Sequence, residues 1–432
     1  MRLLLPLLAL LLFAAPAQAQ LSGEERRMAA AVDAEQDRTI ALLERLVNQN
    51  SGSLNLEGVR AVGEMMRAEL EPLGFTVRWA DMRETGRAGH LIATHPGRGR
   101  NVLLIAHLDT VFEPDSPFQR FTRQGNRATG PGVGDDKGGM VVIVAALRAM
   151  QAAGTLRNAN ITIVLTGDEE RTGSPIAVAR RDLIEAGRVA DFALEFENLA
   201  RNDGRDMGSI ARRSSTNWTL TARGRTGHSS GVCGETMGCG AIYELVRILD
   251  AFRRELPEPN LTYNVGVMAG GTPAALDETG FRASASGKTN VVAAAAVARG
   301  DLRSLTPEQD ARVRAQMQAI VAQHLPNTSA ELVFGEDGYP PMAPTEGNRA
   351  LLARLNGVNR DLGLPEMPEL DPSRRGAADS AFVAADVDTL AGLGAAGGGS
   401  HAEGEWVDLE SLPRQAKRAA ILITRLTRER RR

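Results

Sequence analysis

The chain has 432 residues, of which 43% are hydrophobic, so it can bury the core of two domains or of one large domain with an insertion. It carries 50 basic and 53 acidic side chains, and the resulting net charge of −3 argues against nucleic acid as its main partner. Beyond the first 20 residues no stretch has 18 uninterrupted apolar residues, so the sequence predicts no stable membrane anchor.

The first 19 residues have the pattern of a secretory signal peptide. Arg2 supplies the positive start, residues 3–13 form the apolar stretch, and Ala-Gln-Ala at 17–19 forms the small-residue cleavage pattern. The apolar stretch is short for a membrane span, which is the alternative. We expect a secreted or periplasmic protein whose mature chain begins near Gln20.

Downstream, helix-like and strand-like segments alternate. Residues 56–73 carry apolar side chains at helical spacing, and residues 139–153 predict a buried helix. Residues 101–106, 161–166 and 191–196 are apolar runs typical of buried strands. This alternation predicts an α/β domain with a mainly parallel sheet, and ligands bind such sheets beyond the carboxyl ends of the strands.

The middle of the chain has a different order. Two helical and four strand-like segments follow one another as β-α-β-β-α-β, the ferredoxin-like pattern: strands 218–224, 261–271, 289–303 and 329–336, helices 241–255 and 306–325. We therefore predict an inserted domain at 214–337 and a main domain made of residues 20–213 and 338–432. The stretch GEDGYPPMAP (335–344) is expected to be the return hinge.

The only two cysteines, Cys233 and Cys239, lie six positions apart inside this insertion. In an exported protein such a pair suggests a local disulfide. The alternative is two free thiols in a glycine-rich loop.

Polar clusters follow the apolar runs of the main domain. They are His107 and Asp109 in HLDT, Asp135 and Asp136 in GPGVGDDKGG, Asp168, Glu169 and Glu170 in TGDEE, Glu195 and Glu197 in ALEFEN, and His401 in GGGSHAEGE. Acids in loops are usually solvated, so each cluster alone is weak. Together, carboxylates and imidazoles at one sheet edge would repel unless cations lay among them. Ligands of this kind suit zinc, manganese or cobalt in a hydrolytic site. Two histidines with three acids exceed the needs of one catalytic zinc and suit two metals.

In this order the strings resemble the co-catalytic zinc family of glutamate carboxypeptidase, aminoacylase, succinyl-diaminopimelate desuccinylase and carnosinase, and they look most like the secreted bacterial glutamate carboxypeptidases. The likeness covers nearly all of the mature chain. It implies two Zn²⁺ per chain, with Co²⁺ or Mn²⁺ as substitutes. It also implies a catalytic domain with an inserted dimerisation or lid domain, and hence a homodimer formed through that insertion.

The resemblance also implies a role for each matching residue. Asp135 would bridge both metals, His107 and Glu197 would complete one, and Glu170 and His401 the other. Glu169 would be the general base, and Asp109 the acid that orients His107. The Asp135–Asp136 peptide bond would be cis. Glu195 and Glu197 lie two apart on a strand and so share a face, which leaves the choice between them open; the motif favours Glu197.

Three residues of the insertion match substrate-binding positions of the family. His228 in GRTGHSSG and Asn290 in GKTNVV would stabilise an oxyanion. Arg303 in DLRS would bind a substrate carboxylate in bidentate fashion. Without the resemblance, His228 is an ordinary loop histidine and Arg303 a strand-end arginine.

These observations predict a hydrolase that cleaves the amide bond of a small peptide or N-acyl amino acid beside a free carboxylate, as glutamate carboxypeptidases do. An aminoacylase or a dipeptidase is the alternative within the same chemistry. In a different class, a binding protein on this fold would be expected to lack a ligand or the base. Here all five ligand positions and Glu169 are filled.

Overall fold

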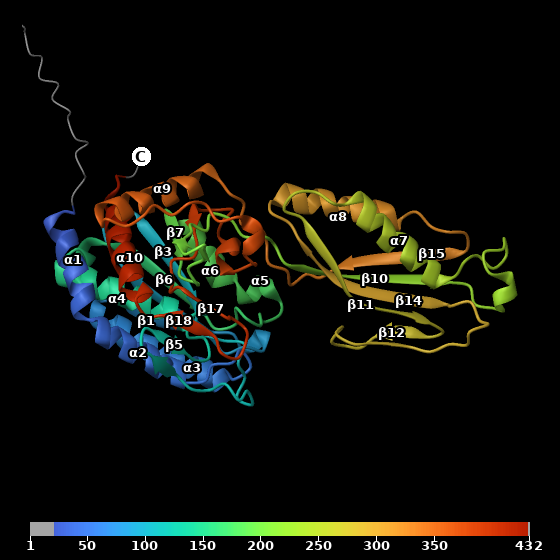
Figure 1. The fold of residues 1–432 in the computed structure, drawn as a ribbon, viewed down its shortest axis with the longest axis horizontal. Helices are drawn as coiled ribbons and strands as arrows, with labels where there is room; N and C mark the ends of the chain where they lie inside the picture. The colour runs from blue at the N-terminus through green and yellow to red at the C-terminus, as the bar shows by residue number, and fades with distance from the viewer. Residues whose placement is uncertain (1–20, 431–432) are drawn as a thin grey trace, which may run out of the picture.

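A computed structural model describes residues 21–430 of the chain. The expected signal peptide lies outside the described residues. Figure 1 shows two bodies joined by two chain crossings, one containing both ends of the described chain and the other its middle. None of the helices in the described part is long and apolar enough to cross a membrane.

The larger body is built on a six-stranded sheet in the order β1-β2-β6-β3-β7-β16. Strands β6, β3, β7 and β16 run parallel; at one side β2 is antiparallel to β6, and β1 is antiparallel to β2. The strands are β1 (Thr76–Asp81), β2 (Gly89–His95), β3 (Asn101–His107), β6 (Asn160–Thr166), β7 (Phe192–Glu195) and β16 (Thr389–Leu390). All residues of β3 are buried, as the unbroken apolar run of a central strand requires.

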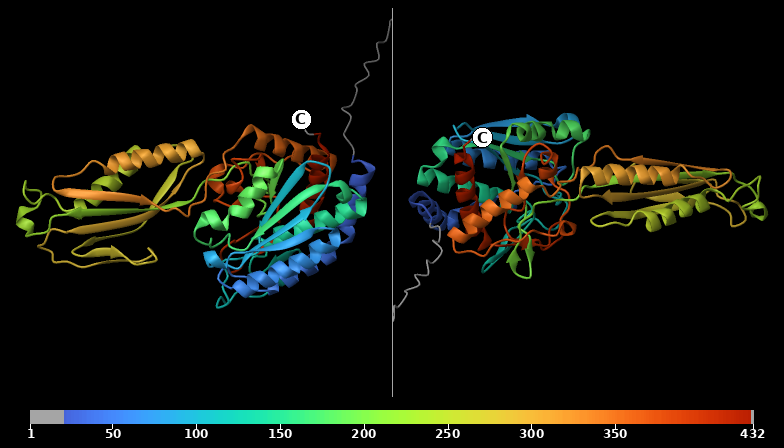
Figure 2. Two further views of the ribbon diagram at one scale, coloured as in Figure 1. Left: turned by 180° about the vertical axis from the view of Figure 1, so that it is seen from behind. Right: turned by 90° about the horizontal axis from the view of Figure 1, so that it is seen from above.

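Helices cover both faces of this sheet (Figures 1 and 2). Alternate side chains of β3 point to opposite faces, so Val102 and Leu104 join the core under α4 and α10, whereas Leu103 and Ile105 pack with Leu183 of α6. The helices are α1 (Gly23–Ala34), α2 (Gln36–Asn48), α3 (Leu56–Leu70), α4 (Lys137–Ala153), α5 (Ile176–Ala179), α6 (Arg181–Val189), α9 (Glu346–Asp361) and α10 (Ser411–Arg428).

Two smaller sheets complete the larger body. One has the order β17-β18-β5-β4 and the other is the β8-β9 hairpin. Their strands are β4 (Thr122–Gln124), β5 (Arg127–Thr129), β8 (Arg201–Asn202), β9 (Arg205–Asp206), β17 (Gly397–Gly398) and β18 (Trp406–Asp408).

The second body has a four-stranded antiparallel sheet in the order β11-β14-β10-β15, with α7 and α8 on one face (Figure 1). Trp218 of β10 is fully buried beneath α7, where its ring meets Phe252 edge to face. The elements are β10 (Thr216–Gly224), α7 (Ala241–Glu255), β11 (Thr262–Gly271), β14 (Ala295–Arg303), α8 (Pro307–Val321) and β15 (Thr328–Phe334), with a β12–β13 hairpin (Ala274–Leu276, Ala283–Ala285) between β11 and β14.

The predicted fold class, a mainly parallel α/β domain with a ferredoxin-like insertion, is confirmed. The expected strand at 289–303 was too long, because β14 begins only at Ala295. The residues before it form a loop that pairs with the segment after β10, where the Ser229 amide donates to the Asn290 carbonyl. The β12–β13 hairpin was not predicted, since its strands are short and rich in alanine.

Two chain segments connect the bodies, and they run antiparallel to each other. Arg212 and Met342 exchange backbone hydrogen bonds of 2.9 Å in both directions, and Ser215 and Tyr339 do the same at 2.9 and 3.0 Å. The expected hinge at 335–344 supplies one of these two strands.

Candidate metal and active site

The polar clusters meet at the carboxyl edge of the parallel strands. His107 is the last residue of β3, and Glu169 and Glu170 follow β6. Glu197 lies two residues beyond β7, and Asp135 immediately precedes the N-terminal region of α4. Parallel strands present their carboxyl ends at one edge, so segments far apart in sequence converge there.

Asp135 lies between two imidazoles. Its Oδ1 is 3.1 Å from His107 Nε2, and its Oδ2 is 3.4 Å from His401 Nε2, which is also 3.0 Å from Glu170 Oε2. One ligand atom each from His107, Asp135 and Glu170 lie within 4.8 Å of one another. This is the arrangement that a carboxylate shared by two cations requires.

A second group shares His107. One ligand atom each of His107, Glu169 and Glu197 lie within 4.8 Å of one another. Glu195 is absent from both groups in the described chain. It is 1% exposed, and its carboxylate accepts hydrogen bonds from the Ser380 amide (2.9 Å) and Arg212 (2.5 Å). The structure thus brings Glu197, rather than Glu195, to the cluster.

Asp109 connects this cluster to the loop after β6. Its Oδ1 accepts the Glu169 amide at 3.0 Å, and its Oδ2 accepts the Glu170 amide at 3.1 Å and the Ser53 hydroxyl at 2.5 Å. His107 Nδ1 is 3.1 Å from the Asp109 carbonyl oxygen and 3.4 Å from Oδ1. Asp109 therefore fixes the His107 ring, whose Nε2 faces Asp135, and fixes the backbone of both glutamates.

The charges at the site favour a cation. Burial, with Glu197 nearby, raises the pKa of Glu169 well above its usual range, and burial raises the pKa of Glu197 to about 7 despite Arg212. Burial also raises the pKa of Glu170, although His401 opposes this. Carboxylates with raised pKa values are short of positive partners, and a divalent cation would supply one. The oxygen and imidazole donors therefore fit two divalent metal ions.

The loop that carries Asp135 is held by a residue that the sequence analysis missed. Glu405 is 1% exposed and accepts the amides of Gly132 (3.1 Å), Gly134 (2.8 Å) and Asp135 (2.9 Å). Burial raises its pKa to about 7, with Asp135 adding to the effect. The peptide bond between Asp135 and Asp136 is cis, as the resemblance implied. Glu405 stands in the same SHAEGE string as His401, and this was the only local signal for it.

Asp168 and Asp136 do not enter the ligand groups. Asp168 is fully buried and binds Arg180 at 2.6 Å. Arg180 also binds Asp379 at 2.7 Å and the Tyr339 hydroxyl at 2.8 Å. Asp136 is fully buried behind His107, whose amide is 3.4 Å from Asp136 Oδ2.

The predicted substrate-binding residues lie at opposite ends of the inserted body. His228 and Asn290 belong to the paired loops beyond the end of β10, whereas Arg303 ends β14 near the hinge and binds Asp301 at 2.9 Å. Nine strand residues at about 3.3 Å each separate His228 from the hinge by roughly 30 Å. Within one chain, His228 and Asn290 are therefore not part of the metal cluster. Cys233 and Cys239, in the loop after His228, form a disulfide.

Arg375 is a candidate that the sequence analysis did not identify. It is close enough to Arg212, Glu197 and Asp135 to feel their charges, and burial lowers its pKa, with Arg212 adding to this. Its Nε and Nη2 are buried and have no hydrogen-bond partner among residues 21–430. A guanidinium with two buried, unpaired nitrogens near these charges can bind an anionic substrate group.

Comparisons with known proteins agree with this geometry. The model of Peptidase family M20/M25/M40 matches residues 103–425. Carboxypeptidase G2 of Pseudomonas sp. (strain RS-16) is 29% identical over 399 residues, which is 90% of this chain and 89% of that protein. Succinyl-diaminopimelate desuccinylase of Gluconobacter oxydans (strain 621H) is 25% identical over 330 residues, 75% of this chain and 77% of that protein.

A solved structure has the same fold. The Bacillus subtilis YxeP protein, described as a dinuclear metal binding peptidase from the M20 family, superimposes with a TM-score of 0.63 at 16% sequence identity. The match covers 91% of this chain and 99% of that one. The likeness therefore extends over both bodies.

Proposed function

Because the chain belongs to peptidase family M20/M25/M40 and is a hydrolytic metal-binding enzyme, we propose that it is an exported two-zinc hydrolase that cleaves an amide bond next to a free carboxylate. The observation that carries the proposal is the position of Asp135, with one carboxylate oxygen toward His107 and the other toward His401. His107, Asp135 and Glu197 would hold one ion, and Asp135, Glu170 and His401 the other. When bound, such a pair activates a water molecule and polarises the substrate carbonyl.

Glu169 is placed to move the proton. Its backbone is fixed by Asp109 and its side chain faces His107 and Glu197 without belonging to the Asp135 group. Its carboxylate would take a proton from the attacking water and deliver it to the nitrogen of the leaving amine. General acid–base catalysis needs a carboxyl within reach of the transferred proton, and the position of Glu169 beside His107 and Glu197 supplies it.

The preference for a free carboxylate rests on Arg375. Its buried, unpaired Nε and Nη2 would gain hydrogen bonds to a substrate carboxylate, whereas Arg303 already has Asp301 as a partner. This supports a carboxypeptidase, in line with the name of the Pseudomonas relative. Cleavage of N-acyl amino acids or dipeptides is the alternative, since both also place a carboxylate beside the amide.

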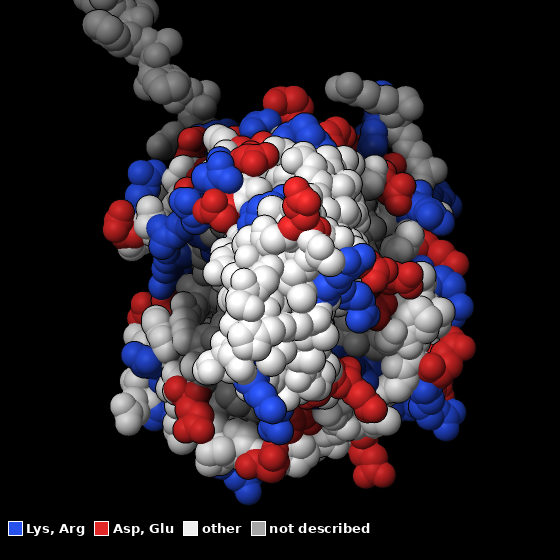
Figure 3. All heavy atoms as spheres, turned by 90° about the vertical axis from the view of Figure 1, so that its right-hand side faces the viewer, with Lys and Arg blue, Asp and Glu red and all other residues white. Residues whose placement is uncertain are grey.

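We place His228 in the active site of a partner chain. It lies too far from its own cluster, and the end of the inserted body that carries it shows few charged side chains (Figure 3), as a surface that enters another subunit requires. A dimer also needs a surface through which the two subunits pair. The edge strand β11 and exposed apolar side chains on α7 and β11 provide one: Ile242, Tyr243, Val246, Val265 and Met268. A two-fold homodimer through the inserted domain would use both surfaces.

The test is a substrate panel with and without the proposed carboxylate contact. Purified zinc enzyme is assayed on folate-type glutamyl amides, dipeptides and N-acyl amino acids, each with a free and with an amidated carboxyl group. Arg375→Gln should lower kcat/KM for the free acids about 10- to 150-fold, since a charged hydrogen bond contributes roughly 1.5–3 kcal/mol, and leave the amidated substrates unchanged. Equal loss on both sets would contradict the role of Arg375, and no hydrolysis of any amide would contradict the function.

A further inference from the structure

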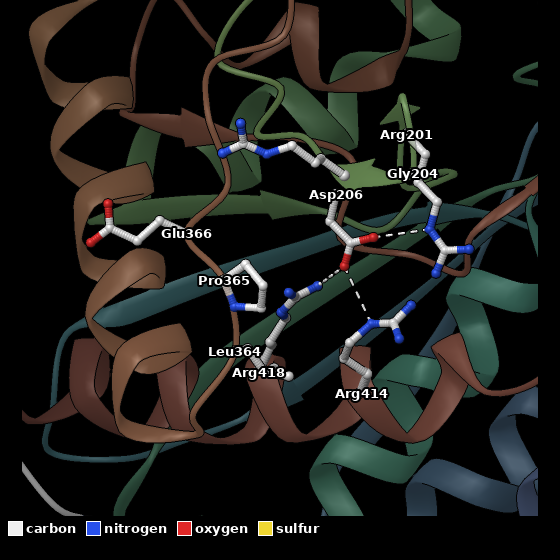
Figure 4. Close-up of a pocket in the computed structure, with 9 residues that line it drawn as sticks. Arg201, Gly204, Asp206, Leu364, Pro365, Glu366, Arg414 and Arg418 are labelled. Atoms are coloured by element: carbon white, nitrogen blue, oxygen red, sulfur yellow. Dashed lines mark hydrogen bonds and ion pairs between the residues drawn. The ribbon is translucent and has the colours of Figure 1, made fainter.

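A pocket lined by arginines lies on the main domain, outside the metal cluster (Figure 4). Its volume is about 220 Å³. Three segments form it: the β8–β9 hairpin, the chain just after α9, and the N-terminal half of α10. The lining residues are Arg201, Gly204, Arg205, Asp206, Leu364, Pro365, Glu366, Arg414 and Arg418.

Asp206 is the centre of the charged groups. Its Oδ1 accepts Arg201 Nε at 2.9 Å, and its Oδ2 accepts Arg418 Nη1 at 2.6 Å. Arg414 Nε lies 3.2 Å from the same Oδ2. Figure 4 shows these three guanidinium groups converging on the single carboxylate.

The positive charge exceeds the negative charge. The residues that line the pocket include four arginines and two acids, Asp206 and Glu366. Outside the lining, Arg360 pairs with Glu366, and Asp408 binds Arg201 at 2.9 Å. The lining residues alone therefore carry two more positive than negative charges. Like charges held this close repel one another, and a bound anion would offset that repulsion.

Some of the donors also lack partners. The exposed Arg205 side chain has no hydrogen bond or ion pair with any residue between 21 and 430. Arg414 Nη2 is buried and has no hydrogen-bond partner in the same range. Burial lowers the pKa of Arg418, although Asp206 opposes this. Asp206 with Arg201, Arg414 and Arg418 fastens the hairpin to α10, and this leaves the Arg205 guanidinium and Arg414 Nη2 unused among residues 21–430.

We propose that this pocket binds a small oxyanion, phosphate or carboxylate, with Arg205 and Arg414 as the groups that contact it. Guanidinium groups suit both, because their paired N–H donors match two oxygens at once. Leu364 and Pro365 form a short apolar wall, and the volume limits the ligand to a single small anion or a short-chain acid. The site is independent of the hydrolytic function and would remain if that function were different.

The test is calorimetric titration of the intact zinc enzyme with inorganic phosphate and, separately, with succinate. The comparison is with the Arg205→Gln/Arg414→Gln double variant. A matched control is Arg349→Gln, because Arg349 is a surface arginine paired with Glu346 and Glu369 on the same domain. Any anion that binds at the metals is common to all three proteins and cancels.

The wild type and Arg349→Gln should bind one more anion per chain than the double variant, or bind it at least tenfold more tightly, and the affinity should fall as salt rises. Stronger binding of phosphate than of succinate would identify an inorganic anion as the ligand, and the reverse an organic acid. Equal stoichiometry and affinity in all three proteins would overturn the proposal. If the double variant fails to fold, Arg205→Gln alone is decisive, because this exposed side chain supports no other contact and its loss must still weaken binding.

Discussion

Tyr339 links the hinge to the proposed general base, and its hydroxyl can be removed without changing its packing. The hydroxyl donates to the Glu169 carbonyl at 2.9 Å, accepts from Arg180 Nη2 at 2.8 Å and lies 2.9 Å from the Thr172 hydroxyl. Its backbone pairs with Ser215 in the hinge, and its ring packs edge to face on Phe382 with centroids 4.9 Å apart. The Tyr339→Phe substitution removes the contact with Glu169 and retains the ring.

The expected loss follows from the partners that remain. Arg180 keeps Asp168 and Asp379, so its charge stays compensated. The Glu169 carbonyl loses the hydroxyl donor, and the Thr172 hydroxyl loses its contact with Tyr339. A neutral hydrogen bond contributes about 0.5–1.5 kcal/mol, and each 1.36 kcal/mol of barrier is tenfold in rate. If that energy serves to position Glu169, kcat should fall about 2- to 12-fold. KM should stay within about twofold, because no substrate contact is proposed for this residue, and metal content should be unchanged.

Tyr263→Phe is the matched control. That hydroxyl donates to the Phe252 carbonyl at 2.8 Å inside the inserted body, so its loss lowers stability to a similar extent without reaching Glu169. Steady-state kinetics and metal analysis on both variants separate positioning from stability. A Tyr339→Phe enzyme with the same kcat as Tyr263→Phe would refute the link between hinge and base.

Three other predictions concern the metals, the dimer and the arginine cluster. Glu169→Gln should keep about two metals per chain and lower kcat about 10²–10⁴-fold, whereas Glu170→Gln should lose metal affinity. Chelation should abolish hydrolysis, and zinc or cobalt should restore it. Full activity of the metal-free protein would contradict this prediction. His228→Ala and Glu169→Ala should each be nearly inactive, but mixed heterodimers should regain activity, since one of their two sites is intact; heterodimers without activity would place His228 elsewhere. Burial raises the pKa of the Asp206 carboxyl, but hydrogen bonds from Arg418 and Arg201 outweigh burial, and the pKa in the folded protein lies below its usual value. The contribution of Asp206 to stability is therefore present above the unfolded pKa of about 3.9 and is lost as the pH falls through the lower folded pKa. Urea unfolding midpoints of the wild type and Asp206→Asn should therefore differ at pH 7 and converge at acid pH, and a constant difference would contradict the assignment.

The sequence was sufficient to locate the edge of the sheet where the site lies. The apolar runs indicated central strands of a parallel sheet. Because parallel strands present their carboxyl ends at one edge, the polar residues that follow them, such as His107 and Glu170, were expected to meet there. The order of the family strings along the chain then indicated the candidate ligands that the structure brings within ligand distance of one another. The β-α-β-β-α-β order likewise required an antiparallel sheet with two helices on one face.

The supporting residues were not predictable because their partners are distant in sequence and their own surroundings carry no pattern. Glu405 binds amides about 270 positions away, and Tyr339 binds the carbonyl of a residue 170 positions earlier. In sequence, Tyr339 is one residue in a proline-rich hinge. Asp168 was given no role, and its partner was equally unpredictable: it sits in the same acidic run as Glu169, yet the turn after β6 directs it to Arg180, which no local rule indicates.

Glu195 and Glu197 show how a distant charge decides what spacing cannot. The two-residue interval places both carboxylates on one side, and indeed both lie 2.5 Å from the same Arg212 Nη2. They differ in depth, because β7 ends at Glu195, which the Ser380 amide holds in the core, while Glu197 lies beyond the strand at 12% exposure. One guanidinium neutralises one of the two charges, and the other remains for a cation. Since only Glu197 reaches His107, the unbalanced charge falls where a metal would bind, and Arg212 fixes this outcome from the hinge strand.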